Sequence, residues 1–143
     1  MKKILLTAVI ISMIMGLPAF AAEGSDVNQD NDIYRRLSLT MLSQYVDKAI
    51  DNYYGEYMTY LPSEDTWDYR ILNIERPSPG KYYYTVRLEV LPYVGPHLTV
   101  GRDRITMKIN LNGVVESVQL DHLESHELPS YYQDIIKKKL PGT

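Results

Sequence analysis

Residues Lys81 to Leu123 constrain the fold of this chain most, because apolar and polar side chains alternate along much of their length. Alternation with a period of two is typical of a strand that buries one of its faces. In a strand over Lys81 to Leu91, the predicted buried residues are Tyr82, Tyr84, Val86, Leu88 and Val90. In the next strand they are Ile105, Met107, Ile109 and Leu111. The pattern predicts a curved antiparallel sheet whose apolar face needs a cover.

Two further strands complete the predicted sheet. Asn112-Gly113 provides two residues that can adopt a positive φ, as a type I′ hairpin turn requires. We expect a return strand over Val114 to Leu123, and an earlier first strand over Trp67 to Arg76. The residues of the return strand expected on one face are Val114, Val118, Leu120 and His122. The sheet therefore has four predicted strands.

The predicted cover is a long helix from Asp32 to Tyr54, capped by Asn31 or Asp32 and closed by Gly55. Its apolar residues at spacings of three and four are Leu39, Leu42, Val46, Ala49, Ile50 and Tyr53. A short second helix is predicted over Pro129 to Leu140, with proline at its first position. This order of elements predicts an α+β fold of cystatin-like or nuclear-transport-factor-like architecture, an analogy that carries no function.

The N-terminal residues predict secretion. Lys2 and Lys3 precede an apolar run, a Gly16/Pro18 break and Ala19-Phe20-Ala21, so we expect a signal peptide over residues 1–21. The alternative is a membrane anchor, but the apolar run is shorter than the roughly 20 residues that span a bilayer. Residues 22–31 are small and polar and are expected to be a disordered leader, followed by a single domain over 32–143. We expect a secreted or cell-wall-associated protein with no membrane span after cleavage.

Charge and cysteine content narrow the range of functions. Without the two lysines of the signal peptide, 15 basic residues become 13 against 18 acidic ones, a formal charge of −5. That charge argues against a nucleic-acid partner. The sequence has no cysteine, and therefore no disulfide, thiol nucleophile or thiolate metal ligand.

Several short motifs stand out along the chain: Asn52-Tyr53-Tyr54-Gly55, Glu75-Arg76, Val94-Gly95-Pro96-His97, Ile105-Thr106-Met107-Lys108-Ile109, and His122 near the end of the last strand. Together they resemble domain of unknown function family 3888, small secreted proteins of Gram-positive spore-forming bacteria. The resemblance covers about Leu37 to Leu123. It implies an extracytoplasmic location and no established biochemical activity.

The connection from Leu91 to Arg102 is the first candidate for a functional site, because a hairpin loop normally has only two to five residues. Glycines and prolines shape this loop, and tyrosine is unusually common in the chain, with 13 Tyr against one Phe and one Trp. Tyrosine combines a flat apolar ring with a hydroxyl and suits interfaces and glycan-binding grooves. The predicted contact residues are Tyr83, Tyr93, Gly95, Pro96 and His97.

These residues favour a secreted, non-catalytic binding or interaction module, without a cofactor, whose partner is an extracytoplasmic protein, peptide or glycan. The alternative is that the loop is a wide crossing which lets the sheet curve around the helix. We also expect the ring of His97 to fix the loop through a hydrogen bond. Asp103, between two arginines, is expected to be a solvated charge at the start of its strand.

The three histidines support a second hypothesis, an extracytoplasmic metal-binding protein or metal-dependent hydrolase. If the last strand continues, His122, Glu124 and His126 project to the same side, and His97 could join them from the loop. Imidazoles with a carboxylate suit zinc or copper. No Gly-x-Ser-x-Gly elbow and no His-Glu-x-x-His motif is present, so we assign no catalytic residue and expect no enzyme.

Overall fold

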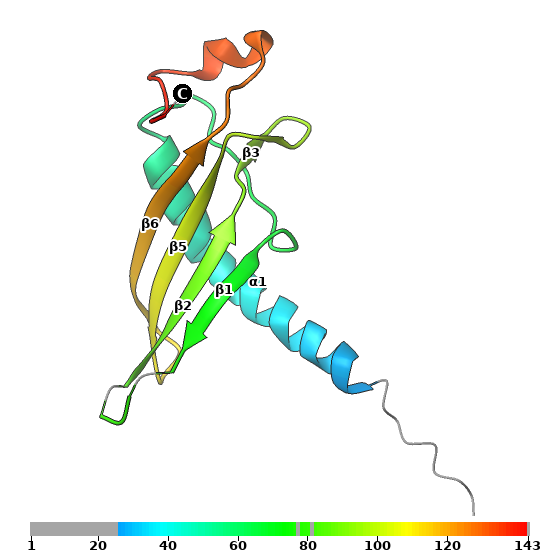
Figure 1. The fold of residues 1–143 in the computed structure, drawn as a ribbon, viewed down its shortest axis with the longest axis vertical. Helices are drawn as coiled ribbons and strands as arrows, with labels where there is room; N and C mark the ends of the chain where they lie inside the picture. Colours follow the sequence, from blue (N-terminus) through cyan, green and yellow to red (C-terminus); the bar gives the residue numbers. More distant parts are fainter. Residues whose placement is uncertain (1–25, 77, 81, 143) are drawn as a thin grey trace, which may run out of the picture.

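The computed structural model describes residues 26–76, 78–80 and 82–142. The predicted signal peptide and residues 22–25 of the predicted leader lie outside this range. A four-stranded antiparallel sheet has the order β1-β2-β5-β6 and is visibly twisted in Figure 1. Its strands are β1 (Arg70–Glu75), β2 (Tyr83–Val90), β5 (Gly101–Asn110) and β6 (Val115–Ser125). The fold is therefore α+β, as the sequence predicts.

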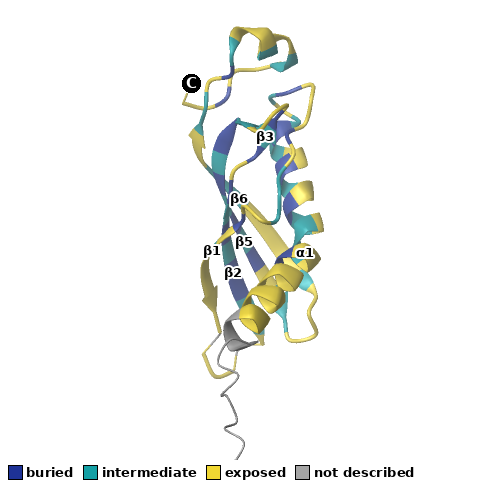
Figure 2. Cartoon of the chain, turned by 90° about the vertical axis from the view of Figure 1, so that its right-hand side faces the viewer, coloured by how far each residue is buried: buried dark blue, intermediate teal, exposed yellow. Residues whose placement is uncertain are grey.

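Helix α1 (Asp26–Tyr54) crosses one face of the sheet, and its N-terminal half extends past the edge of the sheet (Figure 1). It buries Leu39, Val46, Ile50 and Tyr54 in the core, the dark blue layer between helix and sheet in Figure 2. The predicted end at Tyr54 is confirmed, but the predicted start at Asp32 was six residues late. No glycine or proline separates Asp26 from Asp32, so the helix continues through the last part of the predicted leader.

The two central strands bury the predicted face. Val86, Leu88 and Val90 of β2 lie beside Ile105 and Met107 of β5 in the core. The ends of the predicted pattern were wrong, because Tyr82 and Leu111 lie just outside the strands and are exposed to solvent. The predicted first strand also began too early: the amide of Asp68 donates to the carbonyl of Asp65 in a turn, and β1 starts at Arg70.

Strand β6 contains two irregularities that change which side chains share a face. A register shift near Lys108/Ile109 places Val115 opposite Ile109, so Val115 takes the place predicted for Val114, which precedes the strand and is exposed. A second shift follows His122, which is opposite Asp103, whereas Glu124 is opposite Arg102. Leu123 is the extra residue of this bulge, and the alternation along β6 changes phase there.

The predicted long loop contains a small hairpin of its own. Strands β3 (Tyr93–Val94) and β4 (Leu98–Thr99) pair with each other outside the main sheet. An isolated bridge between Ser63 and Tyr93 joins this hairpin to the segment that follows α1.

The second predicted helix is shorter than expected. It is a 3-10 helix, η1 (Ser130–Ile135), that ends five residues before the predicted Leu140. Beyond it the chain is tied to the segment after α1, because Ile136 bridges Met58 and the amides of Lys137 and Lys138 donate to the carbonyl of Tyr57. These tertiary hydrogen bonds replace the helical ones. In the part of the chain that is described, no helix is both long and apolar enough to cross a bilayer.

Candidate functional site

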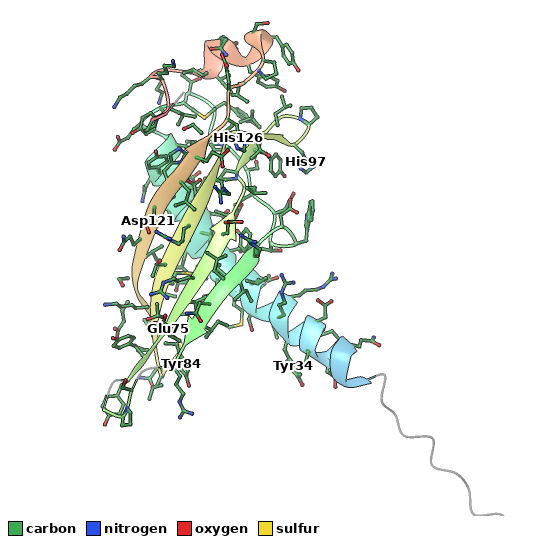
Figure 3. All side chains as sticks on the ribbon, viewed as in Figure 1. Tyr34, Glu75, Tyr84, His97, Asp121 and His126 are labelled. Atoms are coloured by element: carbon green, nitrogen blue, oxygen red, sulfur yellow. The ribbon has the colours of Figure 1, made fainter. Side chains whose placement is uncertain are left out.

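The β3–β4 hairpin presents aromatic side chains at one end of the molecule (Figure 3). Its turn has two residues with positive φ, Gly95 at 52° and His97 at 59°. The backbone amide of His97 donates to the carbonyl of Gly95 at 2.9 Å, which closes the turn. The ring of His97 then lies over Tyr93, with 4.3 Å between the ring centroids and 33° between the planes.

The segment after α1 supplies the rest of this surface. The phenol of Tyr93 donates to the carboxylate of Asp65 at 2.9 Å. The indole of Trp67 lies 6.2 Å from the ring of His97, between centroids. The side chain of His97 is 61% exposed and Trp67 is 64% exposed. We call Asp65, Trp67, Tyr93 and His97 the aromatic patch.

Carboxyl groups surround the aromatic patch. Burial, and after it a hydrogen bond shared with Asp47, raise the pKa of Glu64, and the Tyr69 phenol that donates to it lowers this pKa, so that the net value is about 7. The hydrogen bond to Asp65, then the charges of Asp65, Glu64 and Asp68, raise the pKa of Tyr93. None of these carboxyl groups forms a salt bridge with a described lysine or arginine. The surface is therefore acidic, although the guanidinium of Arg35 donates to the carbonyl of Tyr69 in the same segment at 3.0 Å.

Four of the five predicted contact residues, Tyr93, Gly95, Pro96 and His97, lie together on the hairpin. Tyr83 does not join them: it pairs with Asn110 at the other end of β2, where Lys108 Nζ lies 5.4 Å from its ring centroid. The predicted hydrogen bond from the ring of His97 was wrong. Among the described residues, its side-chain contacts are the tilted rings of Tyr93 and Trp67 and Asp65 Oδ2 at 4.0 Å.

The sequence pattern did not identify Asp65 and Trp67 as members of the patch. They lie about thirty residues before His97, and the Ser63–Tyr93 bridge and the hydrogen bond from Tyr93 to Asp65 bring the two segments together. The available signal in the sequence was that Trp67 is the single tryptophan of the chain.

The predicted metal ligands are separated by the bulge at Leu123. Glu124 lies on the outer face of the sheet, where Arg102 Nη2 is 3.0 Å from its carboxylate and His126 Nε2 is 3.5 Å away. His122 points to the inner face, and His97 belongs to the aromatic patch. The expectation that His122 and Glu124 share one side was therefore wrong. The described residues contain no group of three histidine or acidic side chains that could hold a metal.

A second polar constellation is buried under the end of α1. Asp103 is 0% exposed and accepts a hydrogen bond from Tyr54 Oη at 2.8 Å. His122, 9% exposed at its side chain, has Nδ1 2.7 Å from Asp103 Oδ1 and Nε2 2.7 Å from Ser125 Oγ. Ser125 Oγ donates to the carbonyl of Pro141 at 2.6 Å. The expectation that Asp103 is solvated was wrong.

The hydrogen-bonded side chains of Tyr54, Asp103, His122 and Ser125, which we call the buried chain, are tightly packed. The ring of Tyr53 stacks on His122 with 5.0 Å between centroids, and Tyr54 meets it edge-on at 6.1 Å. A Cβ placed on Gly101 would lie 2.6 Å from Tyr54 Oη and 2.9 Å from His122 Cε1, so this strand position needs glycine. The alternation of side chains along β5 was the available signal that Asp103 is buried, because Asp103 shares the inward face with Ile105 and Met107.

Asp103, His122 and Ser125 contact one another in the order of a hydrolase catalytic triad, but the hydroxyl hydrogen of Ser125 points elsewhere than in a triad. In a triad the serine hydrogen is directed at the histidine, which removes it as a general base. Here the single hydroxyl hydrogen of Ser125 is donated to the carbonyl of Pro141. The geometry thus supports the anchoring of the C-terminal residues by Ser125, not activation of Ser125 as a nucleophile.

The protein is therefore a small α+β domain with an exposed aromatic patch beside acidic residues and with a buried chain of hydrogen-bonded side chains. The family described as "Protein of unknown function (DUF3888)" matches residues 34–124. The chain belongs to this family, as the motifs of the helix end, the hairpin and β5 predict. No curated protein and no solved structure matches the chain significantly.

Proposed function

We propose that this protein is a secreted, non-catalytic binding module and that the aromatic patch is its contact surface. The observation that carries the proposal is the stacked pair of Tyr93 and His97 beside an exposed Trp67. Exposed aromatic rings held in place by packing are the usual anchors of interfaces, because they bury a large area at little entropic cost.

The charges around the patch favour a basic partner. Asp65 and its neighbours Glu64 and Asp68 have no described lysine or arginine partner, and the faces of aromatic rings attract cations as well. A lysine or arginine side chain of an extracellular protein or peptide satisfies both features. A glycan, which would stack on the rings without using the carboxylates, is the alternative partner.

Trp67 provides a direct test, since the fluorescence of the single tryptophan reports on the patch alone. We expect pentalysine to change the Trp67 emission in a saturable manner, and pentaglutamate to leave it unchanged. Asp65→Asn should weaken pentalysine binding roughly two- to fivefold, the size expected for a partly exposed ion pair.

Asp121→Asn is the matched control, because it removes one carboxylate that is paired with Arg104 on the outer face of the sheet. It should bind pentalysine like the unaltered protein. An equal response to both peptides, or equal weakening by the two substitutions, would reject a basic partner. Saturable binding of an N-acetylglucosamine oligomer instead would favour the glycan.

Secretion needs its own test, which is mass spectrometry of the protein recovered from the culture medium. We expect an N-terminus at or near Ala22, the residue that follows Ala19-Phe20-Ala21. A protein in the medium that retains Met1 would contradict signal-peptide cleavage.

A further inference from the structure

We propose that the buried chain Tyr54–Asp103–His122–Ser125 is a proton-dependent latch, which holds Pro141 and Gly142 while the Asp103–His122 pair carries one extra proton. This inference does not depend on the proposed function. It follows from counting the hydrogens that the observed contacts require.

The carbonyl of Pro141 can only accept a hydrogen bond. Ser125 Oγ lies 2.6 Å away, so the single hydroxyl hydrogen must lie in that contact. Ser125 therefore has no hydrogen left for His122 Nε2, at 2.7 Å, and this nitrogen must be the donor. His122 thus carries a hydrogen on Nε2.

The other side of the imidazole needs a hydrogen too. His122 Nδ1 and Asp103 Oδ1 are 2.7 Å apart, and the other carboxylate oxygen already accepts the Tyr54 phenol. The hydrogen between them belongs either to an imidazolium facing a carboxylate or to a neutral carboxyl facing a neutral imidazole. In both cases the pair holds one proton more than a neutral histidine beside an ionised aspartate.

Loss of that proton breaks the chain at one place. With one hydrogen on the imidazole, and that hydrogen donated to Asp103, Nε2 becomes an acceptor facing Ser125 Oγ. The hydroxyl must then turn its hydrogen toward His122 and leave the carbonyl of Pro141 without its donor. Pro141 and Gly142 are thereby loosened, while Leu140 stays buried in the core and Lys137 and Lys138 stay bound through their amides to Tyr57.

The groups around the pair do not supply the missing hydrogen. From α1, Tyr53 and Tyr54 pack on the imidazole, and burial, as the largest cause, raises the pKa of each phenol, so both stay protonated. Beyond Tyr53 lie Tyr57 and Glu56. From the C-terminal side, Lys137 Nζ donates to the carbonyl of Gly55 and Lys138 lies over the Tyr57 ring. On β6, Glu124 is paired with Arg102 and His126 on the outer face.

The direction in which the latch responds to pH follows from the burial of the Asp103 carboxyl group. Burial raises the pKa of Asp103, although the hydrogen bonds from His122 and Tyr54 lower it in part. Without this proton the pair is a buried anion, and with it the pair is neutral overall, so burial favours the pair that keeps its proton. The stabilisation of the C-terminal residues is complete at low pH and is lost as the pH rises through the value at which the folded pair releases its proton.

The test is carbon-detected NMR of the full-length protein, titrated upward from about pH 5 until the imidazole ¹⁵N resonances of His122 show loss of the proton. At low pH we expect protonated Nε2 and ordered backbone at Pro141 and Gly142. As the proton leaves, the ordered population of these residues should fall roughly fivefold, the effect of one hydrogen bond. Order that is unchanged across the imidazole transition, or an unprotonated Nε2 while the residues are ordered, would overturn the latch.

Two variants separate the latch from a general effect of pH. Ser125→Ala removes the link to Pro141, so Pro141 and Gly142 should be loosened at low pH as well, without a further change across the titration. His126→Gln removes an exposed neighbouring histidine on the outer face and should keep the pH dependence of the unaltered protein. Loss of the pH dependence in His126→Gln, or its persistence in Ser125→Ala, would contradict the assignment.

Discussion

At the scale of single residues, the hairpin turn shows what the sequence can and cannot predict. Gly95-Pro96-His97 predicts a shaped turn, because glycine and proline restrict the path in different ways. The left-handed backbone of His97 is not predictable from its residue type, since only a few per cent of non-glycine residues adopt a positive φ. The close approach of the Tyr132 hydroxyl to Gly95, where a Cβ would lie 1.9 Å away, is equally invisible without the fold.

The backbone of His97 leads to a comparison of two substitutions. His97→Gly should be more stable than His97→Ala by about 1 kcal/mol, because both remove the ring and only alanine keeps a Cβ in the left-handed region. Urea unfolding of both variants measures the difference. Equal free energies of unfolding would mean that φ at this position is not positive in solution.

Gly101 offers a second test at the same scale, directed at the buried chain. Gly101→Ala should lower the free energy of unfolding by about 1 to 3 kcal/mol, because its Cβ would approach the carbonyl of Glu124 and Tyr54 Oη to 2.6 Å. Denaturant unfolding measures the loss. Ser117→Ala, on an exposed part of β6, is the control and should change stability by less than about 0.5 kcal/mol.

At the scale of elements, periodicity predicts the middle of each strand better than its ends. Alternation identified the buried residues of β2 and β5, because each must meet the core at every second position. The bulges in β6 depend on its pairing with β5, which the sequence of β6 alone does not contain. For this reason the phase change at Leu123, and with it the separation of Glu124 from His122, could not be predicted.

Helix α1 has a second apolar stripe in addition to the buried face that its periodicity predicts. The buried residues Leu39, Val46 and Ile50 lie on the predicted face, and Tyr54 continues it. A second apolar stripe faces solvent near the N-terminal end and consists of Ile33, Tyr34, Leu37 and Met41. The spacing of this stripe is also helical, so spacing alone cannot tell the two faces apart.

Two alanine substitutions test the assignment of core strands. Leu88→Ala should lower the free energy of unfolding by about 2 to 4 kcal/mol, because the side chain is 0% exposed and leaves a cavity. Ile109→Ala should have a smaller effect, since this residue is half-buried near the open end of the sheet. Calorimetric or chemical unfolding measures both, and equal losses would contradict the described burial.

At the scale of the whole molecule, the acidic surface beside the patch predicts how stability depends on pH. The pKa of Glu64 is raised to about 7 in the folded state, so folding favours its protonated form. Its contribution is fully present below the ordinary glutamate pKa of about 4.3 and is lost as the pH rises through about 7. The unaltered protein should therefore lose stability between these values.

Glu64→Gln tests this assignment, because glutamine can still accept from Tyr69 and no longer ionises. The variant should lose less stability than the unaltered protein when urea unfolding is compared at about pH 5 and about pH 8. Asp103 acts in the same direction in both proteins, so the difference between them reports Glu64 alone. An identical pH dependence would mean that Glu64 is already ionised at the lower pH.

The candidate site as a whole was predicted in part. Half of the aromatic patch, Tyr93 and His97, lies within one short stretch of sequence and was found through its turn residues. The buried chain joins Tyr54 to Asp103 and His122 to Pro141, and such long-range meetings depend on the packing of α1, the sheet and the C-terminal residues together. Local patterns carry no information about them.

Site-specific photocrosslinking in the secreting cells tests most directly whether the partner binds at the hairpin. A photoreactive amino acid in place of the exposed Pro96 should give an adduct larger than the secreted chain itself, whereas the same group in place of Val114 or Met41 should not. An adduct at Met41 without one at Pro96 would contradict the account and place the contact surface on α1.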